Sequence, residues 1–164
     1  MKGGLKVDIG DDLSAKTGKY AETEDTAKNL YLTFEIGGED YSIAVTSVKE
    51  IILYTAITIV PQTEEFVKGI INLRGDIIPV VSVRKRFGLP ELEPDAETCI
   101  VVIFYEDYSI GLLVDCVRGV MSIPEEQISS PPSAHLSYVN AFIKNIGKTE
   151  DGIRLLLDLD KLLQ

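Results

Sequence analysis

The chain is poor in the residues that build metal and catalytic centres. Its 164 residues include one histidine, His135, and two cysteines, Cys99 and Cys116. A zinc site needs three or four imidazole or thiolate ligands, and these three residues include no closely spaced pair. Glycine-rich phosphate loops and the Gly-x-Ser-x-Gly nucleophile motif are also missing, which argues against phosphate binding and acyl transfer. The sequence therefore predicts no metal, no cofactor and no catalytic residue.

Long apolar runs and clustered positive charges are scarce as well. No run approaches the roughly 20 apolar residues that span a bilayer, and no signal-peptide pattern is present. The formal net charge of −10 repels nucleic acid phosphates. The single basic cluster, residues 84–86, is too small to track a phosphate backbone. We therefore expect a cytoplasmic protein without nucleic acid binding or direct membrane insertion, with both cysteines as free, buried thiols.

The sequence is rich in short apolar segments with the two-residue period of β-strands. Residues 1–29 are polar and lack a sustained period, so we interpret them as a flexible leader. From there Leu32, Phe34 and Ile36 alternate with more polar residues, and Gly37-Gly38 favours a hairpin turn. The predicted strands cover residues 31–36, 41–45, 50–53, 56–60, 69–73, 77–83, 99–105, 109–114, 117–123, 138–146 and 153–157.

Two short helices complete the predicted secondary structure. Ser82 is a helix N-cap residue, and Gly88 suits the left-handed conformation that ends a helix, which predicts a single turn over residues 83–87. A closing helix is predicted over residues 158–163. Many short strands with almost no helix favour antiparallel barrels or a sandwich. Two small barrels fit best, because residues 87–97 divide the strands into comparable halves, although the halves could exchange strands.

Two charged residues stand where core packing does not explain them. Glu50 lies between Val48 and Ile51, and Arg74 immediately precedes a turn glycine. Arginine presents a rigid fork of five donors and is enriched at interface hot spots. We predict that Glu50 and Arg74 approach each other across neighbouring strands as an exposed pair, which would contribute about 0.2–1 kcal/mol to stability. The alternative interpretation is an ordinary surface charge.

These segments resemble the CheW domain family in order and spacing, over residues 30–163. The Asn-Leu-Arg-Gly element is the most specific part of the resemblance, and Ser82 departs from it because the family more commonly has aspartate there. The segments that carry the resemblance are Val-Lys-Glu-Ile at 48–51, Pro61, Gly-Ile-Ile-Asn-Leu-Arg-Gly at 69–75, Ile-Pro-Val-Val at 78–81, the glycine-to-Val-Asp-x-Val stretch at 111–120 and Leu-Leu-Leu-Asp-Leu at 155–159.

The resemblance implies a mainly β fold of two intertwined five-stranded SH3-like barrels that share a hydrophobic core, with residues 30–164 as the CheW-like domain. It also implies a non-enzymatic chemotaxis adaptor that couples the cytoplasmic tip of chemoreceptors to the regulatory domain of the histidine kinase CheA in receptor arrays at the membrane. Partner-contacting positions follow from the matching motifs. They are Val48, Glu50, Ile51, Gly69, Arg74, Gly75, Val117 and Val120.

Two other functions are compatible with the residues. The same kind of domain occurs as a regulatory module of a larger kinase or fused to a phosphate-receiving domain, but no αβ pattern follows Leu163. A cleft between barrels could also host a small substrate, because a fold does not dictate function. We expect the adaptor, and a pull-down with both partners separates it from an enzyme.

Overall fold

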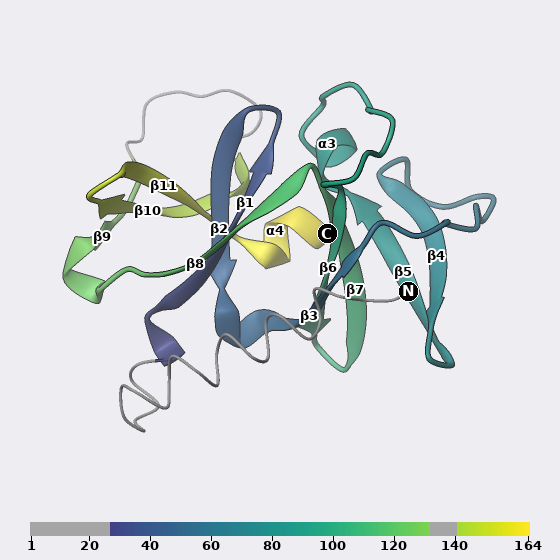
Figure 1. Cartoon of the computed structure of the whole chain (residues 1–164), viewed down its shortest axis with the longest axis horizontal. Helices are drawn as coiled ribbons and strands as arrows, with labels where there is room; N and C mark the ends of the chain where they lie inside the picture. Colours follow the sequence, from purple (N-terminus) through teal and green to yellow (C-terminus); the bar gives the residue numbers. More distant parts are fainter. Residues whose placement is uncertain (1–26, 132–140) are drawn as a thin grey trace.

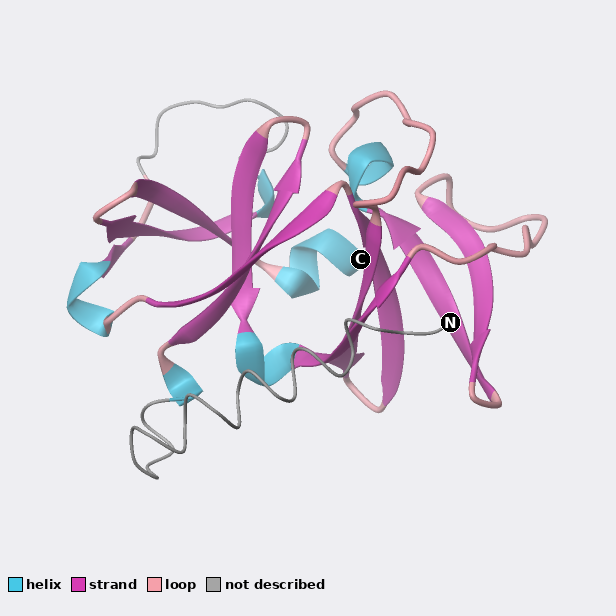
Figure 2. Ribbon diagram, viewed as in Figure 1, coloured by secondary structure: helices cyan, strands magenta, loops and turns pink. Residues whose placement is uncertain are grey.

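The computed structural model describes residues 27–131 and 141–164, and these form two β-sheets with a few short helices (Figures 1 and 2). Most of the predicted leader, His135 and the start of the predicted strand 138–146 lie outside the described residues. The first sheet has six strands in the order β8 (Cys116–Ser122), β1 (Leu30–Ile36), β2 (Glu39–Ala44), β11 (Gly152–Leu157), β10 (Ile143–Thr149) and β9 (Ile128–Ser129). The second sheet has five strands in the order β3 (Val48–Leu53), β6 (Cys99–Tyr105), β7 (Tyr108–Val114), β5 (Asp76–Ser82) and β4 (Val67–Leu73). The helices are η1 (Val45–Ser47), α3 (Val83–Arg86), η2 (Glu125–Gln127) and α4 (Leu159–Leu163).

The two sheets are interleaved along the chain. The second sheet uses one continuous stretch, residues 48–114, whereas the first combines β1 and β2 with strands that follow residue 115. The mainly β architecture is confirmed, with the short β9 as a sixth strand in the first sheet. The expected division at residues 87–97 is wrong, because that segment connects two strands of the second sheet. Most pairings are antiparallel, but β2 with β11 and β5 with β7 are parallel.

One apolar core joins the sheets. Its largest cluster contains Leu32 and Phe34 from the first sheet together with Ile51, Val101 and Leu112 from the second, all at most 2% exposed. A smaller cluster lies within the second sheet alone. The predicted alternation in β1 is confirmed, although Thr33 is also buried, where its hydroxyl is 2.8 Å from that of Ser42. The sheets therefore share a hydrophobic interior and cannot be separated without exposing it.

The connection between the two edge strands of the second sheet pairs with one of them. β3 and β4 are the outermost strands of the sheet order, and Thr58, in the segment between them, exchanges two backbone hydrogen bonds of 2.9 Å with Ile70 of β4. A Cβ on Gly69 would lie 2.1 Å from the carbonyl oxygen of Thr58, so glycine permits this approach. The predicted strand 56–60 is wrong, since the segment forms only this isolated bridge. It closes the sheet instead of extending it.

The hairpin of β10 and β11 differs from the prediction. The predicted strands 138–146 and 153–157 leave Gly147 in the connection between them, but β10 continues to Thr149 and only Glu150 and Asp151 connect it to β11. Gly147 is buried against Ile123, whose Cγ2 would be 3.1 Å from an added Cβ. This glycine therefore serves close packing, which a sequence pattern does not distinguish from a turn.

The predicted helix signals are confirmed. The Ser82 hydroxyl accepts a hydrogen bond of 3.1 Å from the Lys85 amide, and Gly88 ends α3 with φ of +78°.

On α3, the Arg86 guanidinium lies between the rings of Phe66 and Phe142, at 4.5 and 4.7 Å from their centroids. Its nitrogens donate to the carbonyl oxygens of Lys161, Leu162 and Gln164, which fixes α4 between the sheets.

Candidate interaction surface

The turn between β4 and β5 presents an arginine in a strained conformation. Leu73 pairs with Asp76, so Arg74 and Gly75 form a two-residue loop, with φ of +53° and +93°. Positive φ at both positions is the type I′ hairpin geometry, in which asparagine usually precedes glycine. The left-handed conformation costs a residue with a Cβ about 1–2 kcal/mol. The Asn72 side chain supports the loop by accepting the Gly75 amide at 2.9 Å.

Arg74 and Glu50 meet as predicted, but in a different setting. The Arg74 Nη2 atom donates to Glu50 Oε2 at 2.5 Å. Glu50 lies on the edge strand β3 and Arg74 lies in the turn after the opposite edge strand β4, so the two residues do not come from neighbouring strands, and the curl of the sheet brings them together. The expectation of an exposed pair is also wrong, because Glu50 is only 3% exposed while the Arg74 side chain is 54% exposed. The contact therefore ties a surface guanidinium to a buried carboxylate.

The remaining sequence-predicted positions fall into three groups. Gly75 is exposed beside Arg74, whereas Ile51 and Gly69 are buried and support the surface from beneath. Val48 lies on β3, and Val117 and Val120 lie on β8, an edge strand of the first sheet. All three valines are partly buried against the shared core cluster. The predicted set is thus divided between the two sheets.

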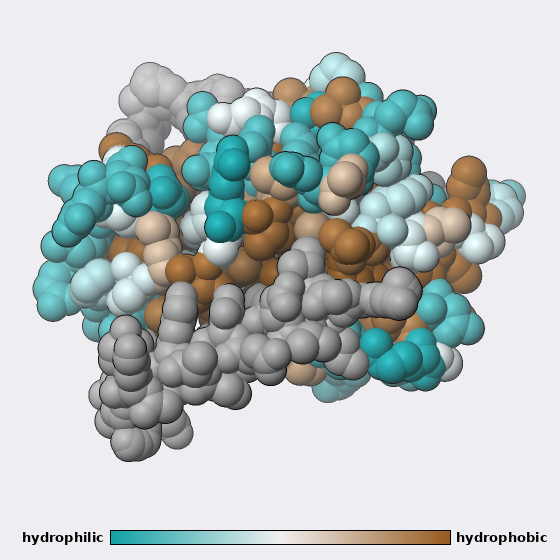
Figure 3. Space-filling view, viewed as in Figure 1, coloured by the Kyte–Doolittle hydropathy of each residue, from teal (hydrophilic) through white to brown (hydrophobic). Residues whose placement is uncertain are grey.

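Sequence reasoning missed an aromatic group beside β3. Phe104 and Tyr108 are each 53% exposed, and the ring of Phe104 lies 5.9 Å from the ammonium nitrogen of Lys49. The same nitrogen lies 3.4 Å from the hydroxyl of Ser109. In the sequence, Phe104 belongs to an unbroken apolar run, which gives no sign that its side chain faces outward. Figure 3 shows apolar side chains gathered where the two sheets meet, with polar side chains around them.

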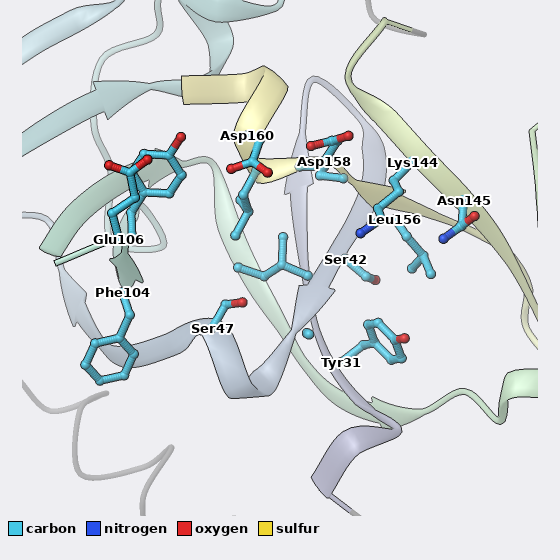
Figure 4. A pocket seen from close by; sticks show the side chains of 15 residues that line it. Tyr31, Ser42, Ser47, Phe104, Glu106, Lys144, Asn145, Leu156, Asp158 and Asp160 are labelled. Carbon is cyan, nitrogen blue, oxygen red and sulfur yellow. The ribbon is translucent and has the colours of Figure 1, made fainter. Parts of the chain in front are cut away.

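A cavity of about 380 Å³ lies beside α4, with lining residues from both sheets (Figure 4). Its polar groups include Lys144, Asp160 and Ser47, but several lining residues already serve the fold. The Asp158 carboxylate caps α4 by accepting the Lys161 amide at 3.2 Å, and the Ser42 hydroxyl contacts Thr33. These two lining groups are therefore used by the fold itself.

The two thiols are poorly suited to nucleophilic chemistry. Burial raises the pKa of Cys99 to about 11, and burial also raises the pKa of Cys116. Both thiols stay protonated near neutral pH, and the thiolate is the reactive form. Both are free, as predicted, with Cys99 buried and Cys116 half-buried.

Within residues 27–131 and 141–164 no group of three metal-ligating side chains occurs, and none of the helices there is long and apolar enough to cross a membrane.

The sequence of the chain matches a known protein family. The family profile described as the CheW-like domain matches residues 30–164. The chain belongs to the CheW-like domain family. The relatives that match most of the chain are chemotaxis proteins named CheW, which is consistent with a chemotaxis coupling adaptor. Family membership confirms the resemblance found in the Asn-Leu-Arg-Gly element and its neighbouring segments.

Individual members of the CheW family cover most of the chain. The chemotaxis protein CheW of Bacillus subtilis is 36% identical over 132 residues, 80% of this chain and 85% of the relative. CheW of Thermotoga maritima is 35% identical, over 81% of this chain and 86% of the relative. The crystal structure of the scaffolding protein TtCheW from Thermoanaerobacter tengcongensis superimposes with a TM-score of 0.77 at 34% identity, over 84% of this chain and 93% of that one. The chain is therefore a CheW-like protein in both sequence and fold.

Proposed function

We propose that this CheW-like chain is the adaptor that holds the cytoplasmic tip of a chemoreceptor and the regulatory domain of the kinase CheA in one signalling array. One observation carries the proposal. In a member of this family, Arg74 stands in a strained turn with its guanidinium half exposed and anchored to the buried Glu50. Such an arrangement suits recognition of another macromolecule better than it suits stability.

The backbone conformation of Arg74 destabilises the fold, whereas its hydrogen bond to Glu50 stabilises it. The left-handed conformation costs about 1–2 kcal/mol, which glycine or asparagine would reduce. A hydrogen bond to a charged group contributes about 1.5–3 kcal/mol, and the exposure of Arg74 lowers that figure through solvent screening. The two effects nearly cancel, so the pair gives little net stability. What Glu50 provides is a fixed direction for the guanidinium, and preorganisation of this kind favours binding.

The other partner-contacting positions fit a helical receptor tip. Val48, Val117 and Val120 supply apolar surface on the edge strands of the two sheets, and amphipathic helices bind in apolar grooves. We propose that Arg74 and Gly75 contact a partner directly. The buried residues Glu50, Ile51 and Gly69 would contribute indirectly, by fixing the conformation of the exposed surface.

The proposal includes the setting in which the protein works. We place it in the cytoplasm, recruited to membrane receptor arrays, with residues 30–164 as the binding domain. Catalysis would belong to the kinase. A role as a regulatory module of a larger kinase or of a receiver-fused protein would use the same surface, and an intact gene sequence distinguishes these cases.

The direct test is binding of Arg74→Ala to a purified receptor tip and, separately, to the regulatory domain of the kinase. We expect the wild-type chain to bind both and the variant to lose more than about 1 kcal/mol of binding free energy toward at least one. Arg154→Ala is the matched control, since Arg154 lies on β11 outside the predicted set, and it should bind normally. Unchanged affinity of Arg74→Ala for both partners would contradict the proposed site.

Reconstitution tests the function as a whole. Kinase autophosphorylation is measured with receptor membranes, with and without the chain. We expect the chain to make kinase activity depend on receptor ligand, and Arg74→Ala to reduce that dependence. A wild-type chain that retains neither partner, or that turns over a small molecule unaided, would favour the enzyme alternative.

A further inference from the structure

The chain passes from one sheet to the other at only two places among the described residues 27–131. The first passage is η1, residues 45–47, between β2 and β3. The second is the single residue Asp115, between β7 of the second sheet and β8 of the first. A one-residue passage leaves the chain little freedom, so the contacts of Asp115 bear directly on how β8 is placed.

Asp115 is bonded to both sheets at once. On the side of the second sheet, its two carboxylate oxygens accept Nε and Nη2 of Arg84, each at 2.9 Å. On the side of the first sheet, Oδ2 also accepts the amide of Gly37 in the β1–β2 turn at 2.8 Å. Its own backbone amide donates to the carbonyl of Glu35 on β1 at 3.1 Å. Asp115 is therefore bonded to α3 on one side and to β1 and the β1–β2 turn on the other.

Arg84 is equally constrained. It lies on α3, which packs against β5 and β7 of the second sheet, and its Nη1 donates to the carbonyl of Pro90 at 2.8 Å. The side chains of Arg84 and Asp115 are only 15% and 20% exposed. A bidentate arginine–carboxylate pair in such a partly buried position fixes direction as well as distance. Ion pairs on the open surface do not constrain geometry in this way.

We propose that Asp115 is the positioning residue that sets the orientation of the first sheet relative to the second, through its bridge from Arg84 to Gly37. Because the proposed partner-contacting residues are divided between the sheets, with Arg74 on one and Val117 and Val120 on the other, this orientation determines whether they form one surface. That functional consequence rests on the proposed adaptor function. The structural claim does not.

Asp115→Asn is the decisive variant because it keeps the size of the side chain. Oδ1 accepts one donor, and Oδ2 accepts two. An amide group offers a single acceptor oxygen, so either orientation of asparagine turns its NH₂ toward a group that can only donate. Glu35→Gln is the matched control. Glu35 is 24% exposed and pairs with Arg118, and because β1 and β8 both belong to the first sheet, the substitution weakens an ion pair within one sheet and leaves the hydrogen bonds of Asp115 to Arg84 and Gly37 in place.

Residual dipolar couplings of backbone amides in the full chain measure the orientation directly. We expect the couplings of both sheets to fit one alignment tensor on this structure in the wild type and in Glu35→Gln. In Asp115→Asn, the couplings of each sheet should still fit the structure of that sheet alone. Fitting both sheets together should require either two different alignment tensors or a rotation of one sheet relative to the other. A variant that keeps the wild-type orientation would overturn the proposal. If Asp115→Asn does not fold, Arg84→Lys, which keeps the charge and loses the fork, takes its place under the same criterion.

Binding of the same variants to a receptor tip tests the functional consequence. We expect Asp115→Asn to bind about tenfold more weakly, the effect of about 1.4 kcal/mol, and Glu35→Gln to bind like the wild type. Altered orientation with unchanged affinity would refute the link to binding. A wild-type chain that does not bind the tip would contradict the proposed function, while the dipolar couplings would still decide the role of Asp115.

Discussion

The pairing of Glu50 with Arg74 gives a buried carboxylate a partner on the surface. Removing the arginine leaves Glu50, at 3% exposure, without its shortest hydrogen bond, and a buried charge that loses a partner is destabilising. We expect Arg74→Ala to lower the free energy of unfolding by about 1–2 kcal/mol, since solvent screening reduces the full effect. Urea denaturation measures this difference.

Glu50→Gln separates the charge from the shape of this pair. With a neutral amide at position 50, Arg74→Ala should cost measurably less than it does in the wild type, because no buried charge is left behind. Additive effects of the two substitutions would contradict this account. The loss expected for Arg74→Ala is larger than the contribution of about 0.2–1 kcal/mol predicted for an exposed pair, because Glu50 is buried. The sequence identifies both residues, but the burial of Glu50 depends on the curl of the whole sheet.

Two glycines of the predicted interface have different physical roles. Gly69 lies against the Thr58 carbonyl, whereas Gly75 has open space where a Cβ would lie, and only its φ of +93° opposes a side chain. We expect Gly69→Ala to cost more than about 2 kcal/mol, and Gly75→Ala about 1–2 kcal/mol from conformation alone. Denaturant midpoints give the ranking. Equal losses would show that close packing at Gly69 is unimportant.

Arg86 anchors helix α4, whose Leu162 is also buried in the shared core. Arg86 donates to carbonyls at the end of α4 and lies between two phenylalanine rings. Arg86→Lys keeps the charge but loses the planar stacking and the fork, so we expect the amides of α4 to exchange hydrogen at least about tenfold faster, which corresponds to about 1.4 kcal/mol. Lys85→Gln on the same helix is the control, because the Lys85 ammonium pairs with the exposed Glu65 at 3.9 Å and not with α4. Equal exchange in the two variants would contradict this role.

Elements with strong local signals could be predicted from the sequence, and elements fixed by distant contacts could not. Ser82 and Gly88 mark α3 because capping depends on nearby backbone alone. Residues 56–60 have the composition of a strand, but only the bridge of Thr58 to Ile70 forms, where Gly69 permits the segment to approach β4 closely. The role of Gly147 was missed for the same reason, since its neighbour Ile123 is distant in sequence.

At the scale of the whole molecule, the interleaving of the sheets came only from the resemblance to a family. Strand periodicity does not reveal that β1 pairs with β8, because nothing in either segment specifies a partner so far along the chain. The candidate site has the same limit. Val117 is predicted by its motif, but its position relative to Arg74 depends on Asp115 and on the packing of both sheets.

A shared core implies that the two sheets unfold together. Val101 of β6 is fully buried in the cluster that contains Leu32 and Phe34 of β1, so a cavity at Val101 weakens packing in both sheets. We expect Val101→Ala to lower the free energy of unfolding by about 2 kcal/mol and to lower the exchange free energies of the slowest amides in both sheets by that same amount. Native-state hydrogen exchange measures each sheet separately. A decrease confined to the second sheet would mean that the two sheets unfold independently. Local bridges such as the one from Arg84 to Asp115 would then have to fix the orientation of the two sheets without help from the core.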